Sequence, residues 1–274
     1  KPLAGLEADA PSDAAVIKPI GTTGNTGIVL SNGLNPEYGK RDAYHMALAV
    51  LDEAIRNAVA VGADPARIAL LDNFCWGDPL RPETLGSLVQ AARGCHDGAL
   101  LFGTPFISGK DSLNNEYLGA DGQRHAIPPT LLISALGLIP DIAKALTMDL
   151  KQAGNLLYLV GEFTPVFGGS HFALLAPDNS DDPIPTLANI TPQVYRALHA
   201  CTQQGLVRSC HDLSEGGLAV AAAEMCIGGR LGLDLDLGPR PPVLGLFGET
   251  TGCLLVEVES ASAGAFKTLF KGLP

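Results

Sequence analysis

The chain has 274 residues, with 18 Lys and Arg against 29 Asp and Glu, so its formal net charge is −11. An acidic chain without a basic patch is a poor partner for a phosphate backbone, which argues against nucleic-acid binding. Hydrophobic residues make up 46% and charged residues 17% of the chain. A sizeable core is therefore expected, and wholesale disorder is excluded. The longest apolar runs, 131–140 and 218–223, are shorter than the roughly 18 residues of a membrane span, so no membrane partner is expected.

The six cysteines form no C-x-x-C pair, which disfavours a zinc ribbon and, at this chain length, a disulfide scaffold. No charged segment followed by an apolar one opens the chain, so secretion is not indicated. A cytoplasmic location with reduced thiols is expected. The chain begins without Met and ends directly after a helical pattern, which favours a fragment of a longer polypeptide.

Strand and helix patterns alternate along the first half of the chain. Residues 42–61 form the strongest helix pattern, because apolar side chains recur along one face and Gly62 supplies a stop. The other predicted elements are strands 14–17, 27–30, 68–71, 102–107 and 130–139, a helix 83–97, and loops 72–82 and 108–129.

The alternation continues beyond a plausible domain boundary at Pro140-Asp141. The predicted elements there are strands 155–160, 206–210 and 252–258 and helices 192–204, 217–227 and 260–270. Residues 231–237 alternate Leu with polar or small residues, which predicts a half-exposed strand. The pattern predicts an α/β (α+β) fold with two domains, 1–140 and 141–274.

Glu53 and Asn57 stand four positions apart in the 42–61 helix and share one face. A carboxylate beside a carboxamide oxygen suits Mg²⁺ that is also held by substrate phosphates. The alternative is an ordinary solvated helix face.

The stretch 108–112, Ser-Gly-Lys-Asp-Ser, follows a predicted strand and invites comparison with a phosphate loop. The Walker A spacing fails, because Thr104 and Asp111 stand where Gly and Ser or Thr are needed. What remains is a turn with a cation, a carboxylate and a hydroxyl, or else a plain polar loop.

The stretch 211–217, His-Asp-Leu-Ser-Glu-Gly-Gly, joins a predicted strand to an Ala-rich helix. Asp212 and Ser214 could cap the helix, or they could form a metal–phosphate site with its free N–H groups. A hydrolase triad is rejected, because neighbouring strand residues face opposite ways and no G-x-S-x-G elbow exists. Upstream, Asp72 ends a strand where α/β folds often bind ligands. Trp76, which follows it, is either a packing anchor or a base-stacking group.

Four stretches occur in the order typical of one family: 52–57, 71–74, 106–113 and 211–218. They resemble phosphoribosylformylglycinamidine synthase, the ATP-dependent amidation enzyme of purine biosynthesis. The resemblance implies a unit related to aminoimidazole ribonucleotide synthetase (PurM-like), with a barrel-pairing N-terminal domain and an α/β C-terminal domain. The chain resembles the second of two such units, C-terminally truncated. The catalytic His belongs to the first unit, so no catalytic residue is expected here.

The resemblance also implies roles for single residues. Asp72, Gly109 and Ser214 would contact nucleotide, and Ser112 would contact substrate or phosphate. Glu53, Asn57 and Asp212 would bind Mg²⁺ beside ATP or ADP. The family also places an Asp in the strand before the helix, but 31–34 reads Ser-Asn-Gly-Leu, and Lys110 replaces an Asn. These departures predict a weakened or lost auxiliary site.

The implied activity is that of an ATP-dependent carbon–nitrogen ligase with glutamine as amide donor. Its implied partners are formylglycinamide ribonucleotide, a glutaminase subunit or domain, and the missing first half. The alternative is a non-catalytic half that completes a pseudo-dimer and holds an auxiliary nucleotide. Selenophosphate synthetases and hydrogenase-maturation enzymes share the unit, but their Gly-rich segment with Cys or Lys near the N-terminus is not found.

Overall fold

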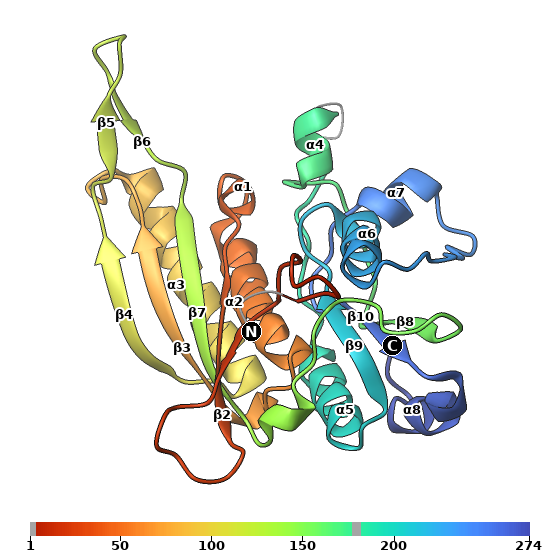
Figure 1. The fold of residues 1–274 in the computed structure, drawn as a ribbon. Helices are drawn as coiled ribbons and strands as arrows, with labels where there is room; N and C mark the ends of the chain where they lie inside the picture. Colours follow the sequence, from red (N-terminus) through yellow and green to blue (C-terminus); the bar gives the residue numbers. More distant parts are fainter. Residues whose placement is uncertain (1–3, 177–181) are drawn as a thin grey trace.

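The computed structural model describes residues 4–176 and 182–274 (Figure 1). A five-stranded sheet has the order β1-β2-β7-β3-β4, and a three-stranded sheet has the order β8-β10-β9. The strands of the first sheet are β1 (Ala15–Ile17), β2 (Gly27–Gly33), β7 (Thr130–Ile139), β3 (Ile68–Cys75) and β4 (Phe106–Ser112). Those of the second are β8 (Leu156–Val160), β10 (Leu254–Val258) and β9 (Val207–Asp212). A separate hairpin joins β5 (Glu116–Leu118) to β6 (Arg124–Ala126).

Eight α-helices are present within the described residues, and they pack on or beside these sheets. They are α1 (Pro36–Gly39), α2 (Ala43–Ala60), α3 (Pro82–Phe102), α4 (His171–Leu175), α5 (Thr191–Gln203), α6 (Gly217–Gly229), α7 (Pro242–Phe247) and α8 (Ala263–Leu269). None of the helices in the described ranges is long and apolar enough to cross a membrane.

The first sheet is covered on one face by α2 and α3 and open on the other (Figure 1). Burial alternates strictly along β7: residues such as Leu131 and Ile133 face the helices, and their neighbours are half-buried on the open face. This is the pattern of a sheet with one covered face. Asp42 caps α2, because its side chain accepts from the backbone N–H groups of Tyr44 and His45, both at 3.0 Å.

The second sheet is covered on both faces. Residues of α6 pack with Leu255 of β10 in one apolar cluster. Residues of α5 and α8 pack with Val256 on the other side. All five residues of β10 are buried, as expected for the central strand of a doubly covered sheet.

The two halves meet along α2, which lies between the first sheet and β9 (Figure 1). Asp52, one residue before Glu53, accepts from the Tyr195 hydroxyl and from the Gly252 backbone N–H at 2.8 Å. Arg56, one turn on, pairs with both Asp52 and Asp212. The buried surface between the halves therefore includes charges as well as a continuous apolar core.

The helix predicted at 42–61 and the strand predicted at 130–139 are confirmed by α2 and β7. The predicted loops 72–82 and 108–129 are partly wrong, and so is the strand 102–107, since α3 extends to Phe102. Polar residues at the end of β3 pair in parallel with those of β4, and the β5–β6 hairpin follows. Tertiary pairing overrides the low strand preference of Asp, Asn and Lys here.

The strand predicted at 231–237 is also wrong. The segment forms no strand, although Leu231, Leu233 and Leu237 are partly buried against the α6 cluster. The alternating leucines indicate which side chains of the segment face the core. A strand also needs a neighbouring strand with which to pair, and the alternation does not provide one.

Trp76 is fully buried, and its indole N–H donates to the Ser87 hydroxyl at 3.0 Å. It is a packing anchor and cannot stack on a base. All six cysteines are free thiols, as expected. Each of the two sheets lies on one side of residue 140, and within the described ranges no strand pairing crosses that point.

Candidate functional site

The residues predicted to form a site lie in two separate groups. Glu53, Asn57, Asp212 and Ser214 lie where α2 faces the end of β9, at the junction of the two halves. The other three lie on β3 and β4, beyond β7 in the order of the first sheet: Asp72, Gly109 and Ser112.

The junction group is a cluster of carboxylates. Glu53 accepts from the Leu34 backbone N–H at 3.0 Å, and Asn57 donates to the Asn32 carbonyl oxygen at 3.2 Å. Asp212 ends β9 and is buried, and its Oδ2 accepts from Arg56 Nη2 at 3.1 Å. The Asp212 Oδ2 atom is thus occupied by the guanidinium.

A third carboxylate, Asp13, joins this cluster and was missed by the sequence reasoning. Its Oδ1 accepts from the Asp212 backbone N–H at 3.0 Å and lies 2.8 Å from His211 Nδ1. Ligand atoms of Asp13, His211 and Asp212 all lie within 4.8 Å of one another. The only feature of the sequence that marks Asp13 is its position directly before the first predicted strand. Its contact with β9 follows from the fold and not from a local pattern.

Two oxygen atoms in the cluster are buried without a hydrogen-bond partner, Asp13 Oδ2 and Asn57 Oδ1. Leaving such atoms unpaired costs about 1–3 kcal/mol each. Both are hard oxygen ligands, the type that Mg²⁺ prefers. Asp13 and Asp212 lie close enough to share one divalent cation, whereas the Glu53 carboxylate on α2 is not part of that 4.8 Å group.

The electrostatics of the cluster combine buried carboxylates with two cationic side chains. Burial raises the pKa of Glu53 well above its usual range, and the carboxylates of Glu215 and Asp212 raise it further. Burial and the Asp13 carboxylate raise the pKa of Asp212, against the opposing effect of Arg56. Two cationic groups offset part of this charge: Arg56 pairs with Asp212, and, against the lowering effect of burial, the Asp13 and Glu224 carboxylates raise the pKa of His211 well above its usual range.

The stretch 31–34, which lacks the carboxylate that the family places before the helix, packs closely against α2 at Gly33. A Cβ atom at Gly33 would lie 2.1 Å from the Val50 carbonyl oxygen of α2. Position 33 therefore accepts only glycine in this backbone, and the prediction of a weakened or lost auxiliary site stays a prediction. Asp13 supplies a carboxylate to the junction cluster from a different segment.

Ser214 lies in the turn that enters α6, and its carbonyl oxygen accepts from the Gly217 N–H at 3.1 Å. Gly216 and Gly217 both have positive φ, at 80° and 66°. Few other residues tolerate this conformation, so the two glycines fix the turn beside Asp212.

The β3–β4 group is divided between the two faces of the first sheet. Asp72 and Gly109 are register partners. Side chains alternate between the two faces along β3, and Asp72 is two positions from each of the buried residues Leu70 and Phe74, so the pair lies on the helix-covered face. A Cβ at Gly109 would lie 2.4 Å from Asp72 Oδ1, so a larger residue there would force the Asp72 side chain to move. Burial, and then the Asp111 carboxylate, raise the pKa of Asp72.

Ser112 lies on the open face, where Lys110 Nζ donates to its hydroxyl. The structure therefore places Asp72 and Gly109 together, with Ser112 on the opposite face of the same strands. Neither part adjoins the junction cluster in the sheet order.

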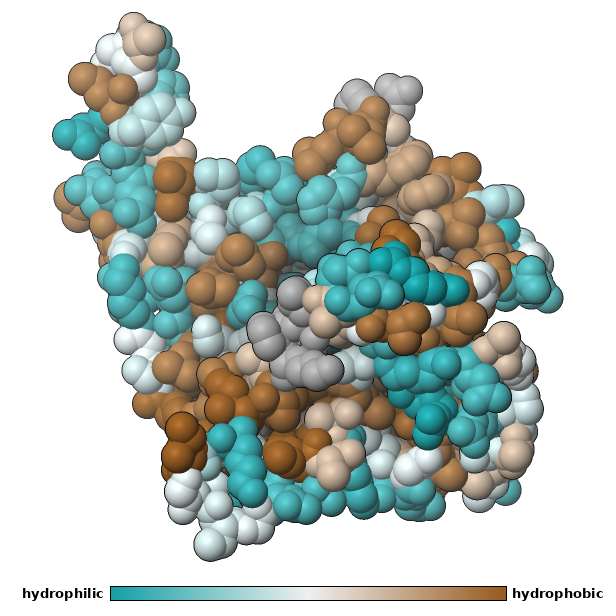
Figure 2. Space-filling model, viewed as in Figure 1, coloured by the Kyte–Doolittle hydropathy of each residue, from teal (hydrophilic) through white to brown (hydrophobic). Residues whose placement is uncertain are grey.

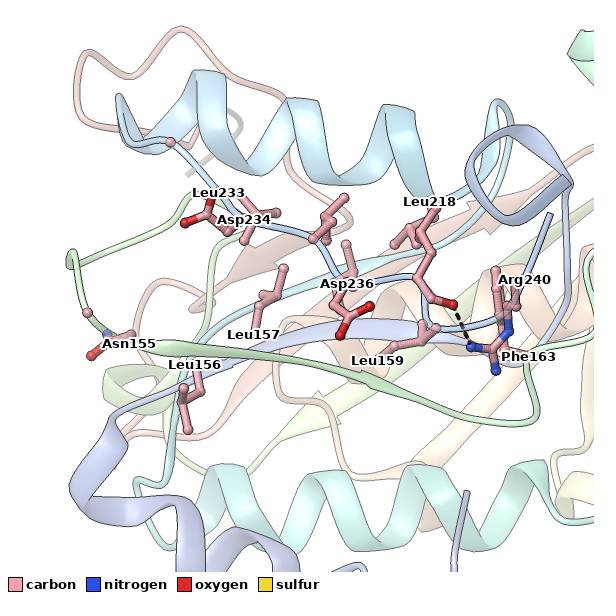
Figure 3. A pocket seen from close by; sticks show the side chains of 15 residues that line it. Asn155, Leu156, Leu157, Leu159, Phe163, Leu218, Leu233, Asp234, Asp236 and Arg240 are labelled. Carbon is pink, nitrogen blue, oxygen red and sulfur yellow. Dashed lines mark hydrogen bonds between the residues drawn. The ribbon is translucent and has the colours of Figure 1, made fainter. Parts of the chain in front are cut away.

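A groove of about 540 Å³ lies elsewhere, between β8 and the segment 231–237 (Figure 3). Leu157 and Leu159 of β8 line the groove on one side and Leu233 and Asp236 line it on the other, and Arg240 donates to the Leu237 carbonyl oxygen at 3.4 Å. None of the predicted site residues lines this groove. The groove lies along the unpaired edge of β8 and is not part of the candidate site.

With this geometry in view, the chain can be placed in a family. Residues 11–139 match the model of the AIR synthase related protein N-terminal domain, and residues 152–274 match that of its C-terminal domain. The chain belongs to the AIR synthase related protein family. The α/β (α+β) fold class with two PurM-like domains in this order is confirmed.

Within this family, the chain is similar to phosphoribosylformylglycinamidine synthase subunit PurL, which confirms the resemblance to that enzyme. The Gloeobacter violaceus subunit is 38% identical over 238 residues, covering 85% of this chain and 30% of the relative. The Deinococcus radiodurans subunit is 35% identical over 272 residues, covering 96% of this chain and 36% of the relative. The chain thus spans about a third of the length of these relatives.

Solved structures share the fold at low identity. Thermotoga maritima PurL complexed with FGAR has a TM-score of 0.74 at 18% identity, covering 98% of this chain and 43% of that one. The same protein complexed with ADP has a TM-score of 0.70 at 15% identity, covering 98% and 41%. The HypE–HypF complex has a TM-score of 0.62 at 15% identity, covering 96% and 83%.

Proposed function

We propose that the chain is the second nucleotide-binding unit of a phosphoribosylformylglycinamidine synthase, and that its junction cluster binds Mg²⁺ together with ATP or ADP. The observation that carries the proposal is the pair of buried, unpartnered oxygens of Asp13 and Asn57 beside Glu53 and Asp212. PurL relatives at 35–38% identity, and PurL structures complexed with ADP and ATP, support it.

In this proposal, Asp13, Glu53, Asn57 and Asp212 would hold the ion, which when bound neutralises charge on the nucleotide phosphates. Arg56 holds one oxygen of Asp212 and so fixes the orientation of that carboxylate. The turn at Ser214 and the first N–H groups of α6 present partial positive charge to an anion.

The auxiliary role, in which the nucleotide is held without turnover, is favoured by the surroundings of the nearest histidine. His211 is 8% exposed and lies between Asp13 and Glu224, with ring nitrogens 2.8 and 3.0 Å from their oxygens. Both nitrogens are engaged, so this imidazole is not available as a general base.

The open face of the first sheet supports pairing with a second unit. Leu30, Ile17 and Ile107 are 45, 46 and 57% exposed on β2, β1 and β4. Figure 2 shows apolar side chains over the lower part of the lobe that holds this sheet. Exposed apolar surface of this kind marks an interaction site. We assign it to the first half of the synthase, with formylglycinamide ribonucleotide and a glutaminase subunit or domain as the further partners.

Calorimetric titration with Mg-ADP tests the nucleotide site. Asp212→Asn removes one charge from the ligand set and is expected to weaken binding by roughly 10–100-fold, or about 1.4–2.8 kcal/mol. Glu53→Gln should cost a similar amount, and the double variant should be less than additive, because both residues act on one ion. A wild-type chain that binds no Mg-ADP would overturn the proposal.

A second experiment separates a catalytic from an auxiliary role. Amidation of formylglycinamide ribonucleotide is measured with this chain alone and with a first-half polypeptide added, each with glutaminase or ammonia. The chain alone should show no turnover. Turnover by the purified chain alone would contradict the assignment of the catalytic His to the missing half.

A further inference from the structure

Glu249, a carboxylate outside the ligand set, is buried at 0% exposure just before β10. Its backbone is anchored, since its N–H donates to the Val166 carbonyl oxygen at 2.9 Å and its own carbonyl accepts from the Val166 N–H at 3.0 Å. The side chain is therefore presented from a fixed position.

The Glu249 carboxylate accepts hydrogen bonds from three segments far apart in the sequence. Oε2 accepts from the Tyr38 hydroxyl at 2.6 Å, and Oε1 accepts from the backbone N–H groups of His171 at 2.9 Å and Gly216 at 3.0 Å. Tyr38 belongs to the first half of the chain, whereas His171 and Gly216 belong to the second. One carboxylate thus joins the two halves.

Two of these segments directly adjoin residues of the junction cluster. Tyr38 lies in α1, which closely follows Leu34, the residue whose N–H donates to Glu53 at 3.0 Å. Gly216 lies in the turn that follows Asp212 and holds Ser214. The turn packs directly against the residue before Glu249, because a Cβ at Gly217 would lie only 2.4 Å from the Gly248 carbonyl oxygen.

We propose that Glu249 is a positioning residue for the Mg-nucleotide site: its three hydrogen bonds hold α1 and the 213–217 turn at the separation that the ligand set needs. This inference rests on the proposed function. Glu249 acts by fixing the positions of these segments. Both of its carboxylate oxygens already accept hydrogen bonds from N–H and O–H donors, so it does not join the ligand set.

The test compares two substitutions that separate geometry from charge. Glu249→Gln keeps an oxygen that can accept from both N–H groups and an amide that can donate to Tyr38, but it removes the charge. Glu249→Asp keeps the charge, but its shorter side chain cannot reach all three donors. In calorimetric titration, the Mg-ADP affinity of Glu249→Gln should lie within about threefold of that of the wild type. The affinity of Glu249→Asp should be weaker by roughly 10-fold or more.

Glu257→Asp is the matched control. Glu257 is also buried and accepts from the Lys151 and Gln152 N–H groups, but it lies nearer the other end of β10. This variant should lose stability and keep its Mg-ADP affinity. Near-ultraviolet circular dichroism confirms folding of each variant. Should Glu249→Asp fail to fold, Tyr38→Phe, which removes one donor, is expected to weaken binding in its place.

The outcomes separate the two proposals. Suppose that the wild type binds Mg-ADP, that Glu249→Gln binds it more weakly, and that Glu249→Asp binds it with unchanged affinity. That result would show an electrostatic effect and overturn the positioning role alone. Equal affinity in all folded variants would do the same. Absence of Mg-ADP binding by the wild type overturns the proposed function and this inference with it.

Discussion

Replacing Arg56 with Met should destabilise the fold strongly, because it removes the cation between two buried carboxylates. Arg56 is 2% exposed, Asp52 0% and Asp212 6%. After the change, Asp52 keeps the Tyr195 hydroxyl and the Gly252 N–H, but Asp212 Oδ2 loses both of its guanidinium donors. Breaking a buried pair by removing one partner costs about 3–5 kcal/mol, a large share of the roughly 5–15 kcal/mol that stabilises a domain.

Urea unfolding followed by circular dichroism measures this loss. Arg230→Met is the matched control, because Arg230 pairs with Asp9 at 2.6 Å while both side chains are about half exposed. An exposed pair contributes roughly 0–1 kcal/mol, so the control should stay near wild type. Arg56→Lys should fall between them, since one ammonium cannot replace a guanidinium that spans both carboxylates. An Arg56→Met variant no less stable than the control would refute the reasoning.

Three further predictions concern packing and surface. Gly33→Ala should cost about 1–3 kcal/mol in urea unfolding through overpacking against α2, whereas Gly86→Ala, with no atom within 4 Å of its Cβ, should not destabilise. A thiol reagent should label Cys75 and Cys226 in the native protein, and the remaining four cysteines only after unfolding; fast labelling of all six would contradict the burial. Leu30→Lys on the open sheet face should reduce self-association in analytical ultracentrifugation, and an equal effect of Leu100→Lys on α3 would contradict that assignment.

The regular parts of the fold could be predicted because one pattern dominated each of them. α2 has an apolar stripe, a capping Asp42 and a terminal Gly62, and β7 is a long β-branched and apolar run between prolines. The polar ends of β3 and β4 could not be predicted, because their strand structure depends on pairing with each other.

The candidate site was predictable only in part. Glu53 and Asn57 were found because helical spacing puts them on one face, and Asp212 because it follows a strand and precedes a helix. Asp13 was missed because an Asp before a strand is a common capping or turn residue. Its neighbour in space, Asp212, stands 199 positions away, and no local pattern reports a contact of that range.

The path of the N-terminal segment has a consequence for how the site is assembled. Before it enters β1, the chain crosses to the second half, where Leu6 N–H donates to the Gly228 carbonyl oxygen at 3.0 Å and Asp13 reaches β9. The proposed ligands therefore come from the N-terminal segment, α2 and β9, and these segments meet only in the docked native arrangement. A bound divalent ion would stabilise that arrangement over any state in which the halves are separated. Metal affinity would thus act as a direct measure of domain docking, and a chain that is correctly folded in each half but undocked would not bind the ion.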